Sequence, residues 1–390
     1  MKYFNKLIKS GVIIFSFVLF FIIYILVIKY MYNEDLSYHA RFSLEIMKGE
    51  RPMFGNFLLY MLVPVFAGFS KSLLYHKISL CFLIAIATTI KFVWAKNKIN
   101  EIGLFSYDIS KRYWMSVLIA FSLIFVYVIP IPSYLLFDRF YLGNFVPNTW
   151  HNSTTIFLFP FAILLFYQSY KQIVEYDSKR NIIILILMIV NIFIKPSFFF
   201  VFICVYPLFM FIRHKLSKPF WISLLILFIG GLCLALEYFS IYLIGKDETQ
   251  ASSVVINIFF CYENFSPLSM LPFAIIFSLL FPLVYYIMNY KKRKKDILTW
   301  YILAMLIVSF LIYFILAESG LRATHGNFYW QIIICVWIFY FYALFFLLKD
   351  IKDQGFSLKN KILTGLYSVH VLLGLIYVIR LYSIGSAFLA

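Results

Sequence analysis

The sequence predicts an all-α polytopic membrane protein with about 11 transmembrane helices. Of its 390 residues, 63% are hydrophobic and only 13% are charged, a balance outside the range of soluble domains. The apolar runs are continuous and about 20 residues long, as helical spans require, and do not alternate as the strands of a membrane barrel do. We therefore expect residues 1–390 to form a single integral membrane domain, with no separate soluble domain.

The first span is expected at residues 11–30, after a basic N-terminal stretch. This apolar run is too long for a signal peptide, and no small-residue cleavage site follows it. Residues 31–72 then form the first outer loop. Within that loop, residues 56–69 are apolar, but the stretch is short and contains Pro64. We expect it to form a helix that lies in the membrane interface and does not cross.

The remaining apolar runs predict ten further spans. They cover residues 73–95, 113–130, 156–170, 182–194, 198–212, 220–243, 268–289, 297–316, 328–348 and 362–382. The fifth and sixth spans of the chain, 182–194 and 198–212, are each short for a full crossing. They meet at Lys195 and Pro196, so we expect a helical hairpin whose tip is buried in protein below the outer surface.

The distribution of charge orients this topology. The predicted inner segments hold about 23 of the Lys and Arg residues but only about 7 of the acids, which agrees with the positive-inside rule. The strongest inside signal is the basic run 291–295. If residues 56–69 crossed the membrane, this run would lie outside. We therefore expect a multi-pass protein of the plasma membrane, with its N-terminus in the cytoplasm and its C-terminus outside.

The composition also excludes some partners. The net charge of +17 could suggest nucleic-acid binding, but the cations lie in short loops where they orient the spans. We expect no nucleic-acid partner. The five cysteines show no CxxC spacing, so neither a metal site nor a disulfide framework is indicated.

An acidic pair, Glu34 and Asp35, directly follows the first span. Such a pair at a membrane surface fits a catalytic base, a metal site or an ion-coupling site, and its structural alternative is to cap the first outer helix. On a helix, Asp35 shares a face with His39, whereas Arg41 points elsewhere. We therefore expect Asp35 to face the same side as His39 and Glu34 to be a supporting or capping acid, with His39 and Arg41 as substrate-binding residues.

Other polar residues gather on the predicted outer side. Asn148 and His151 belong to a polar stretch before the fourth span, and Lys195 lies at the hairpin tip, where a charge is costly without a function. Arg322 and His325 flank the end of another span. An ion pair of Arg322 with the acid four residues earlier is the structural alternative. We expect all five to bind substrate, with the three cations contacting a phosphate.

The layout resembles the GT-C superfamily of membrane glycosyltransferases. The resemblance rests on the acid after the first span, on the stretch Asn56-Phe-Leu-Leu-Tyr60 to Phe66-Ala-Gly-Phe-Ser70 with the span after it, and on the hairpin at Lys195-Pro196. It covers about the first 215 residues. The stretches from Asn148 to Thr154 and from His325 to Phe328 also look like motifs of bacterial membrane proteins from surface-polysaccharide clusters.

This resemblance implies a GT-C-like fold with interfacial helices in the first outer loop. It also implies an inverting transfer of a sugar from a polyprenyl-phosphate-linked donor to a glycan or lipid-linked acceptor on the outer face of the plasma membrane. The acid after the first span acts as base in that family and maps onto Asp35 or Glu34. Because Asp35 shares a helical face with His39, the resemblance implies that Asp35 is the general base and Glu34 the supporting acid. The chain shows no clear metal-binding motif, and a divalent metal ion is left open as a cofactor.

Three other activities stay open at this point. A polymerase of lipid-linked repeat units would use the same outer arginines and histidines. A transporter or flippase could use Glu34 and Asp35 as coupling acids, although the sequence shows no internal repeat and its charges cluster at one surface. A membrane acyltransferase could use His151 or His325 as its base.

Overall fold

The computed structural model describes residues 2–31, 35–53, 55–104, 108–137, 139–242 and 253–385 of the chain. The helices are α1 (Lys2–Tyr30), α2 (Asp35–Met47), α3 (Leu58–Phe66), α4 (Leu73–Ile102), α5 (Ile109–Phe125), α6 (Ile131–Phe137), α7 (Ser153–Val174), α8 (Ser178–Ile194), α9 (Ser197–His214), α10 (Lys218–Tyr242), α11 (Phe260–Glu263), α12 (Leu271–Ser278), α13 (Leu280–Met288), α14 (Tyr290–Arg293), α15 (Ile297–Ile315), α16 (Trp330–Gln354) and α17 (Leu358–Ile384). Three 3₁₀ turns, η2 (Leu268–Met270), η3 (Gly320–Arg322) and η4 (Asn327–Tyr329), and two strands, β1 (Val254–Ile256) and β2 (Leu316–Glu318), complete the fold.

The prediction of an all-α polytopic membrane protein is confirmed. In the described residues, 8 helices are long and apolar enough to cross a membrane: α1, α4, α7, α9, α10, α15, α16 and α17. The pair α12 and α13 forms a further candidate, broken by a bend of 63°. The two other predicted spans coincide with α5 and α8, which are 17 residues long each. A total of 11 crossings therefore stays a prediction.

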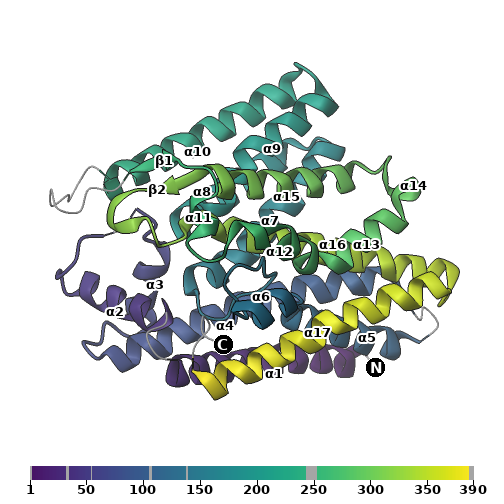
Figure 1. The fold of residues 1–390 in the computed structure, drawn as a ribbon, viewed down its shortest axis with the longest axis horizontal. Coiled ribbons are helices and arrows are strands. Elements are labelled where there is room, and N and C mark those ends of the chain that lie inside the picture. Colours follow the sequence, from purple (N-terminus) through teal and green to yellow (C-terminus); the bar gives the residue numbers. More distant parts are fainter. Residues whose placement is uncertain are drawn as a thin grey trace.

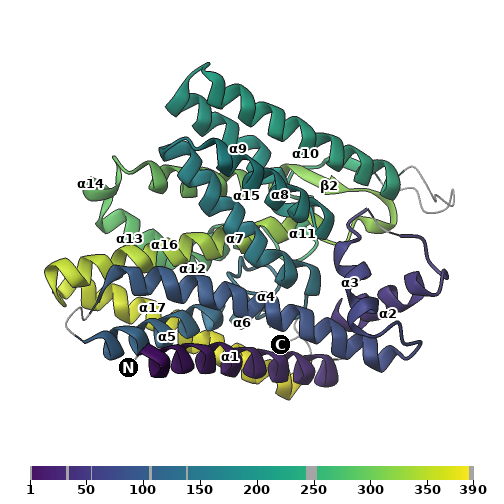
Figure 2. The ribbon, with the colours of Figure 1, turned by 180° about the vertical axis from the view of Figure 1, so that it is seen from behind.

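The helices lie roughly side by side in one bundle (Figure 1), with α16 at its centre. In the most apolar part of α16, 94% of the residues are buried, against 22% in α10 at the periphery. Helix α16 contacts α4, α7, α9, α13, α15 and α17. Helices α2 and α3 and the small sheet lie at one end of the bundle, and the N-terminus and α14 lie at the other, as Figure 2 shows from behind.

The connection between α1 and α4, predicted as the first outer loop, contains two short helices, α2 and α3. Helix α3 has 9 residues, too few to cross a bilayer. Its exposed side chains include Met61, Val65 and Phe66, an apolar face suited to the membrane interface. The opposite face of α3 packs on α2, α4 and α8. The interfacial placement of residues 56–69 therefore agrees with the length and the surface of this helix.

The third predicted span, residues 113–130, is wrong in its final turn. Helix α5 ends at Phe125, and residues 126–130 are buried without being helical. The backbone N–H of Tyr127 donates instead to the carbonyl of His370 on α17, at 3.0 Å. A Cβ added at Gly374 would lie 1.4 Å from the Phe125 carbonyl oxygen, so α17 passes too close to this chain for a helix turn. Such backbone is tolerated at membrane depth only inside protein.

The two strands were not predicted from the sequence. They pair antiparallel, with Val254 opposite Glu318 and Ile256 opposite Leu316. Each strand has only three residues, too few to show an alternating pattern. The sheet fixes the start of the segment 318–330, which contributes several side chains to the cavity described next.

Candidate functional site

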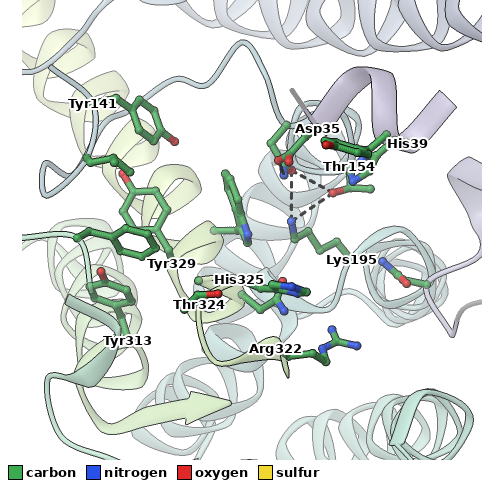
Figure 3. A pocket seen from close by; sticks show the side chains of 18 of the residues that line it. Asp35, His39, Tyr141, Thr154, Lys195, Tyr313, Arg322, Thr324, His325 and Tyr329 are labelled. Carbon is green, nitrogen blue, oxygen red and sulfur yellow. Dashed lines mark hydrogen bonds between the residues drawn. The ribbon is translucent and has the colours of Figure 1, made fainter. Parts of the chain in front are cut away.

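A cavity of about 560 Å³ opens at the end of the bundle that carries α2 and α3, within the size range of ligand pockets. Segments far apart in the chain line it. Its polar and charged lining residues are Asp35, Tyr38, His39, Arg51, Asn56, Tyr60, Asn144, Asn152, Thr154, Lys195, Arg322, Thr324, His325 and Asn327. Figure 3 shows Asp35, Thr154 and Lys195 close together, facing three tyrosines across the cavity.

Asp35 is held by the start of another helix. It lies in the first turn of α2, and its Oδ2 accepts a hydrogen bond of 2.6 Å from the Asn152 amide. Asn152 is the N-cap of α7, where its Oδ1 accepts the N–H of Thr155 at 3.0 Å. Two helix N-termini therefore converge on one carboxylate, and the partial positive charge of each stabilises an anion. In the described part of the chain, no hydrogen bond reaches the other carboxylate oxygen.

The environment keeps Asp35 ionised. Burial alone would raise the pKa of Asp35, but His39, His151, the Asn152 amide and Lys195 outweigh it and hold the pKa below its ordinary value. Burial also lowers the pKa of His39 and of His151 to about 4. Both imidazoles are therefore neutral near pH 7, where the amide and the ammonium group are left to stabilise the carboxylate.

Lys195 lies in the break between α8 and α9, with only 8% of its surface exposed. Its Nζ donates to Asn152 Oδ1 at 3.2 Å, to Thr154 Oγ1 at 3.2 Å and to Thr155 Oγ1 at 3.3 Å. It also lies 4.3 Å from the centre of the Trp330 ring, a favourable position for a cation. Burial lowers the pKa of Lys195 to about 7, although Asp35 opposes this shift.

The two histidines have different environments. His39 lines the cavity, and its Nδ1 is 2.5 Å from the hydroxyl of Ser153. His151 is fully buried behind the cavity wall, packed edge-on against Tyr141 at 4.8 Å and near Trp330. His39 is therefore in reach of a ligand in the cavity, whereas His151 supports the wall and acts on Asp35 only at a distance.

The segment after β2 adds Arg322 and His325 to the cavity. Arg322 Nε lies 2.9 Å from Glu318 Oε1, and the Asn327 amide donates to the other oxygen of Glu318. The ion pair predicted as the structural alternative is thus present, and Arg322 reaches the cavity as well. Arg51 also lines the cavity, paired with Glu45 at 2.8 Å.

The other half of the cavity lining is aromatic. It consists of Tyr141, Phe145, Tyr262, Phe265, Tyr313, Tyr329 and, next to Lys195, Trp330. Figure 3 shows Tyr141, Tyr313 and Tyr329 together on this side, across from Asp35 and Lys195. Tyrosine offers an apolar ring face and a polar hydroxyl, a combination that suits a sugar ring with its apolar faces and hydroxyl rim.

The structure brings five of the predicted site residues to the cavity: Asp35, His39, Lys195, Arg322 and His325. It does not bring Arg41 or Asn148 there. Arg41 lies on another face of α2, because it is two residues from His39 and therefore about 200° away around the helix. Asn148 is buried and accepts a hydrogen bond of 2.7 Å from Lys91 in α4. Glu34 lies outside the described residues.

Three polar residues of interest were not identified from the sequence. Arg51 lines the cavity from a loop that showed no motif. Lys91 lies fully inside α4, with its Nζ 3.6 Å from the Phe159 ring centre. Glu237 is 4% exposed near the end of α10 and packs against Gly55 so closely that a Cβ there would be 2.2 Å from Glu237 Cγ. A charge inside an apolar run was the available signal for Lys91 and Glu237.

Among the described residues, no group of three or more His, Cys, Asp or Glu side chains is arranged to hold a metal ion. Whether a divalent metal ion is a cofactor stays open, as it was in the sequence analysis. No protein-family model matches this chain, and comparison with curated proteins gives no significant match. The class that the fold defines is therefore a polytopic all-α membrane protein with a charged and aromatic cavity at one end.

Proposed function

We propose that this protein is a GT-C-type glycosyltransferase that moves a sugar from a polyprenyl-phosphate-linked donor to a glycan or lipid-linked acceptor. The observation that carries the proposal is the placement of Asp35. It follows the first span directly, starts the first outer helix and faces a 560 Å³ cavity together with Lys195 and Arg322. A carboxylate base beside two cations is the arrangement that sugar transfer from a lipid phosphate requires.

The proposed base is the Asp35 carboxylate. In an inverting transfer, the acceptor hydroxyl attacks the anomeric carbon while its proton passes to Asp35, and the bond from that carbon to the phosphate oxygen breaks. General-base catalysis of this kind contributes about 10²–10⁴-fold. The Asn152 amide donates to one carboxylate oxygen, and the proposal assigns the proton to the other oxygen of this cavity-lining residue.

The leaving group is a lipid phosphate, whose negative charge grows as the bond breaks. Lys195, Arg322 and His325 lie on the cavity wall to receive it, and preorganised cations in a poorly solvated site stabilise such charge strongly. The Trp330 ring and the hydroxyls of Thr154 and Thr155 fix the Lys195 ammonium in advance. The aromatic half supplies stacking surfaces for the sugar rings.

The proposal places the reaction at the outer face of the plasma membrane, with the N-terminus in the cytoplasm. Two features support this orientation. Helix α2, which lines the cavity, and α14, which contains the start of the basic run 291–295, lie at opposite ends of the bundle, and basic loops favour the cytoplasmic side. A lipid-linked donor reaches such a cavity from the bilayer, and the interfacial helices α2 and α3 border its mouth.

The test uses the purified protein in liposomes with radiolabelled polyprenyl-phosphate sugars and an extract of candidate acceptors. We expect transfer that is lost in Asp35→Asn and strongly reduced in Arg322→Gln. A single added sugar supports a glycosyltransferase, whereas a ladder of products identifies a polymerase of repeat units. Absence of transfer from every polyprenyl-phosphate sugar, by protein that remains folded, would contradict the proposal.

A further inference from the structure

A second, smaller cavity lies on the other face of helix α2. It has a volume of about 290 Å³ and lies between the end of α1, the helix α2 and the start of α4. Three cations line it, one from each helix: Lys29, Arg41 and Lys77. We name it the basic notch. Arg41, which does not line the large cavity, lines this one.

The positive charge of the basic notch is not neutralised by its described surroundings. None of its described lining residues is acidic. In the part of the chain that the structure describes, neither Lys29, Arg41 nor Lys77 forms an ion pair. Three cations that line one cavity, with no acid among its described lining residues, repel one another and favour an anion among them.

The remaining lining residues suit a lipid headgroup. Ser37 and Tyr38 contribute hydroxyl groups, and Ile28 and Met31 contribute apolar surface. Lys29 and Lys77 stand at the ends of two candidate spans, α1 and α4, that lie at the same end of the bundle as α2. A notch at these ends of two membrane-crossing helices would be level with the headgroup region of one leaflet.

Exposed apolar side chains adjoin the notch. Ile22 lies two turns before Lys29 on α1, and Leu74 and Ile78 flank Lys77 on α4. All three side chains are exposed. The acyl chains of a lipid whose phosphate occupies the notch would contact apolar side chains such as Ile22, which is closer to the middle of α1 than Lys29 is.

We propose that the basic notch binds the phosphate of an anionic membrane lipid. Basic pockets between transmembrane helices at the membrane surface bind phosphate headgroups in this way. A free phosphate ion shares the charge but lacks the acyl chains that the apolar surface would cover. The proposal does not depend on the sugar-transfer reaction.

The notch is positioned to influence the large cavity through α2. Tyr38 lines both cavities, and Asp35 begins the helix that separates them. A lipid phosphate that draws Arg41 toward α1 and α4 would fix the orientation of α2, and with it the direction of the Asp35 carboxylate.

The experiment measures lipid binding by native mass spectrometry of the detergent-purified full chain, with phosphatidylglycerol or phosphatidylcholine of the same acyl chains. The test variant combines Arg41→Gln with Lys77→Gln. The control variant combines Lys48→Gln with Lys71→Gln, which removes the same charge from exposed positions of the same loop region. Thermal unfolding of each variant verifies that it is folded.

We expect the wild type and the control variant to retain phosphatidylglycerol over phosphatidylcholine. The test variant should bind it more weakly by about fivefold for each cation removed. Equal binding of both lipids by the wild type, or equal weakening in the control variant, would overturn the proposal. If the test variant does not fold, a second measurement still tests the proposal. A photoreactive residue introduced at position 37 of the otherwise wild-type protein should cross-link to phosphatidylglycerol. Displacement of that lipid by millimolar inorganic phosphate alone would identify a site for free phosphate and would also overturn it.

Discussion

The substitution Asp35→Asn tests the proposed base with little change in geometry. The Asn152 amide donates to Asp35 Oδ2 at 2.6 Å, and the carbonyl oxygen of an asparagine at position 35 can accept the same hydrogen bond. The favourable interaction of a charge with the helix N-termini is lost, which costs about 1 kcal/mol. The variant should therefore insert and fold, and it should still bind the anionic donor.

The rate of transfer should respond far more strongly than the stability. An amide cannot accept the acceptor's proton, so we expect kcat to fall by about 10²–10⁴-fold, which corresponds to about 2.7–5.4 kcal/mol in activation free energy. The assay compares single-turnover transfer and donor Kd for the wild type, Asp35→Asn and the control Glu50→Gln, in which the native glutamate side chain is 57% exposed. Near-normal turnover in Asp35→Asn would refute the assignment. If Glu34→Gln is inactive instead, the site stands and Glu34 is its base.

Four further outcomes follow from the geometry. Lys195→Met should raise the donor Kd by about tenfold to a hundredfold, as expected for a lost charge-assisted hydrogen bond; unchanged affinity with poor expression would show a structural role. Because the pKa of Lys195 is about 7, its charge is present below pH 7 and lost above it, so donor binding should weaken as the pH rises through 7, whereas Lys195→Arg should remove this dependence. Gly374→Ala should lower the thermal stability by about 1–3 kcal/mol or more, while Gly365→Ala in the same helix, which has nothing within 4 Å of the added Cβ, should not; equal effects would contradict the close packing at Phe125. A cysteine at Lys294 should react with a membrane-impermeant reagent only from the cytoplasmic side, and labelling from outside would overturn the proposed orientation.

The helices of the bundle could be predicted because their signal is local. An apolar run of about 20 residues specifies a span from composition alone, and each predicted span overlaps a helix or the bent pair α12 and α13. The interruption at residues 126–130 could not be predicted, because its cause is the approach of Gly374, about 250 residues away along the chain. The short strands β1 and β2 depend in the same way on a partner distant in sequence.

For the site, the sequence predicted only on which side of the membrane its residues lie. Positive-inside reasoning brought Asp35, Lys195 and Arg322 to one face, and the structure gathers them around one cavity. The same reasoning does not distinguish cavity-facing from other residues on that face. Arg41, expected to bind substrate, lines the smaller cavity on another face of α2, and Asn148 proved to be the buried partner of Lys91.

Asn152 shows why a residue of such a site escapes prediction. Its Oδ1 accepts from the backbone of α7, from Thr154 and from Lys195, while its amide donates to Asp35. In the sequence it is an ordinary N-cap before an apolar run. In the fold, the cap places the N-terminus of α7, the lysine of the hairpin and the acid after the first span in one hydrogen-bonded group. Asp35 and Lys195 lie in different segments, and Asn152 forms a hydrogen bond with each of them. The arrangement of the proposed base and its cation therefore depends on the start of α7.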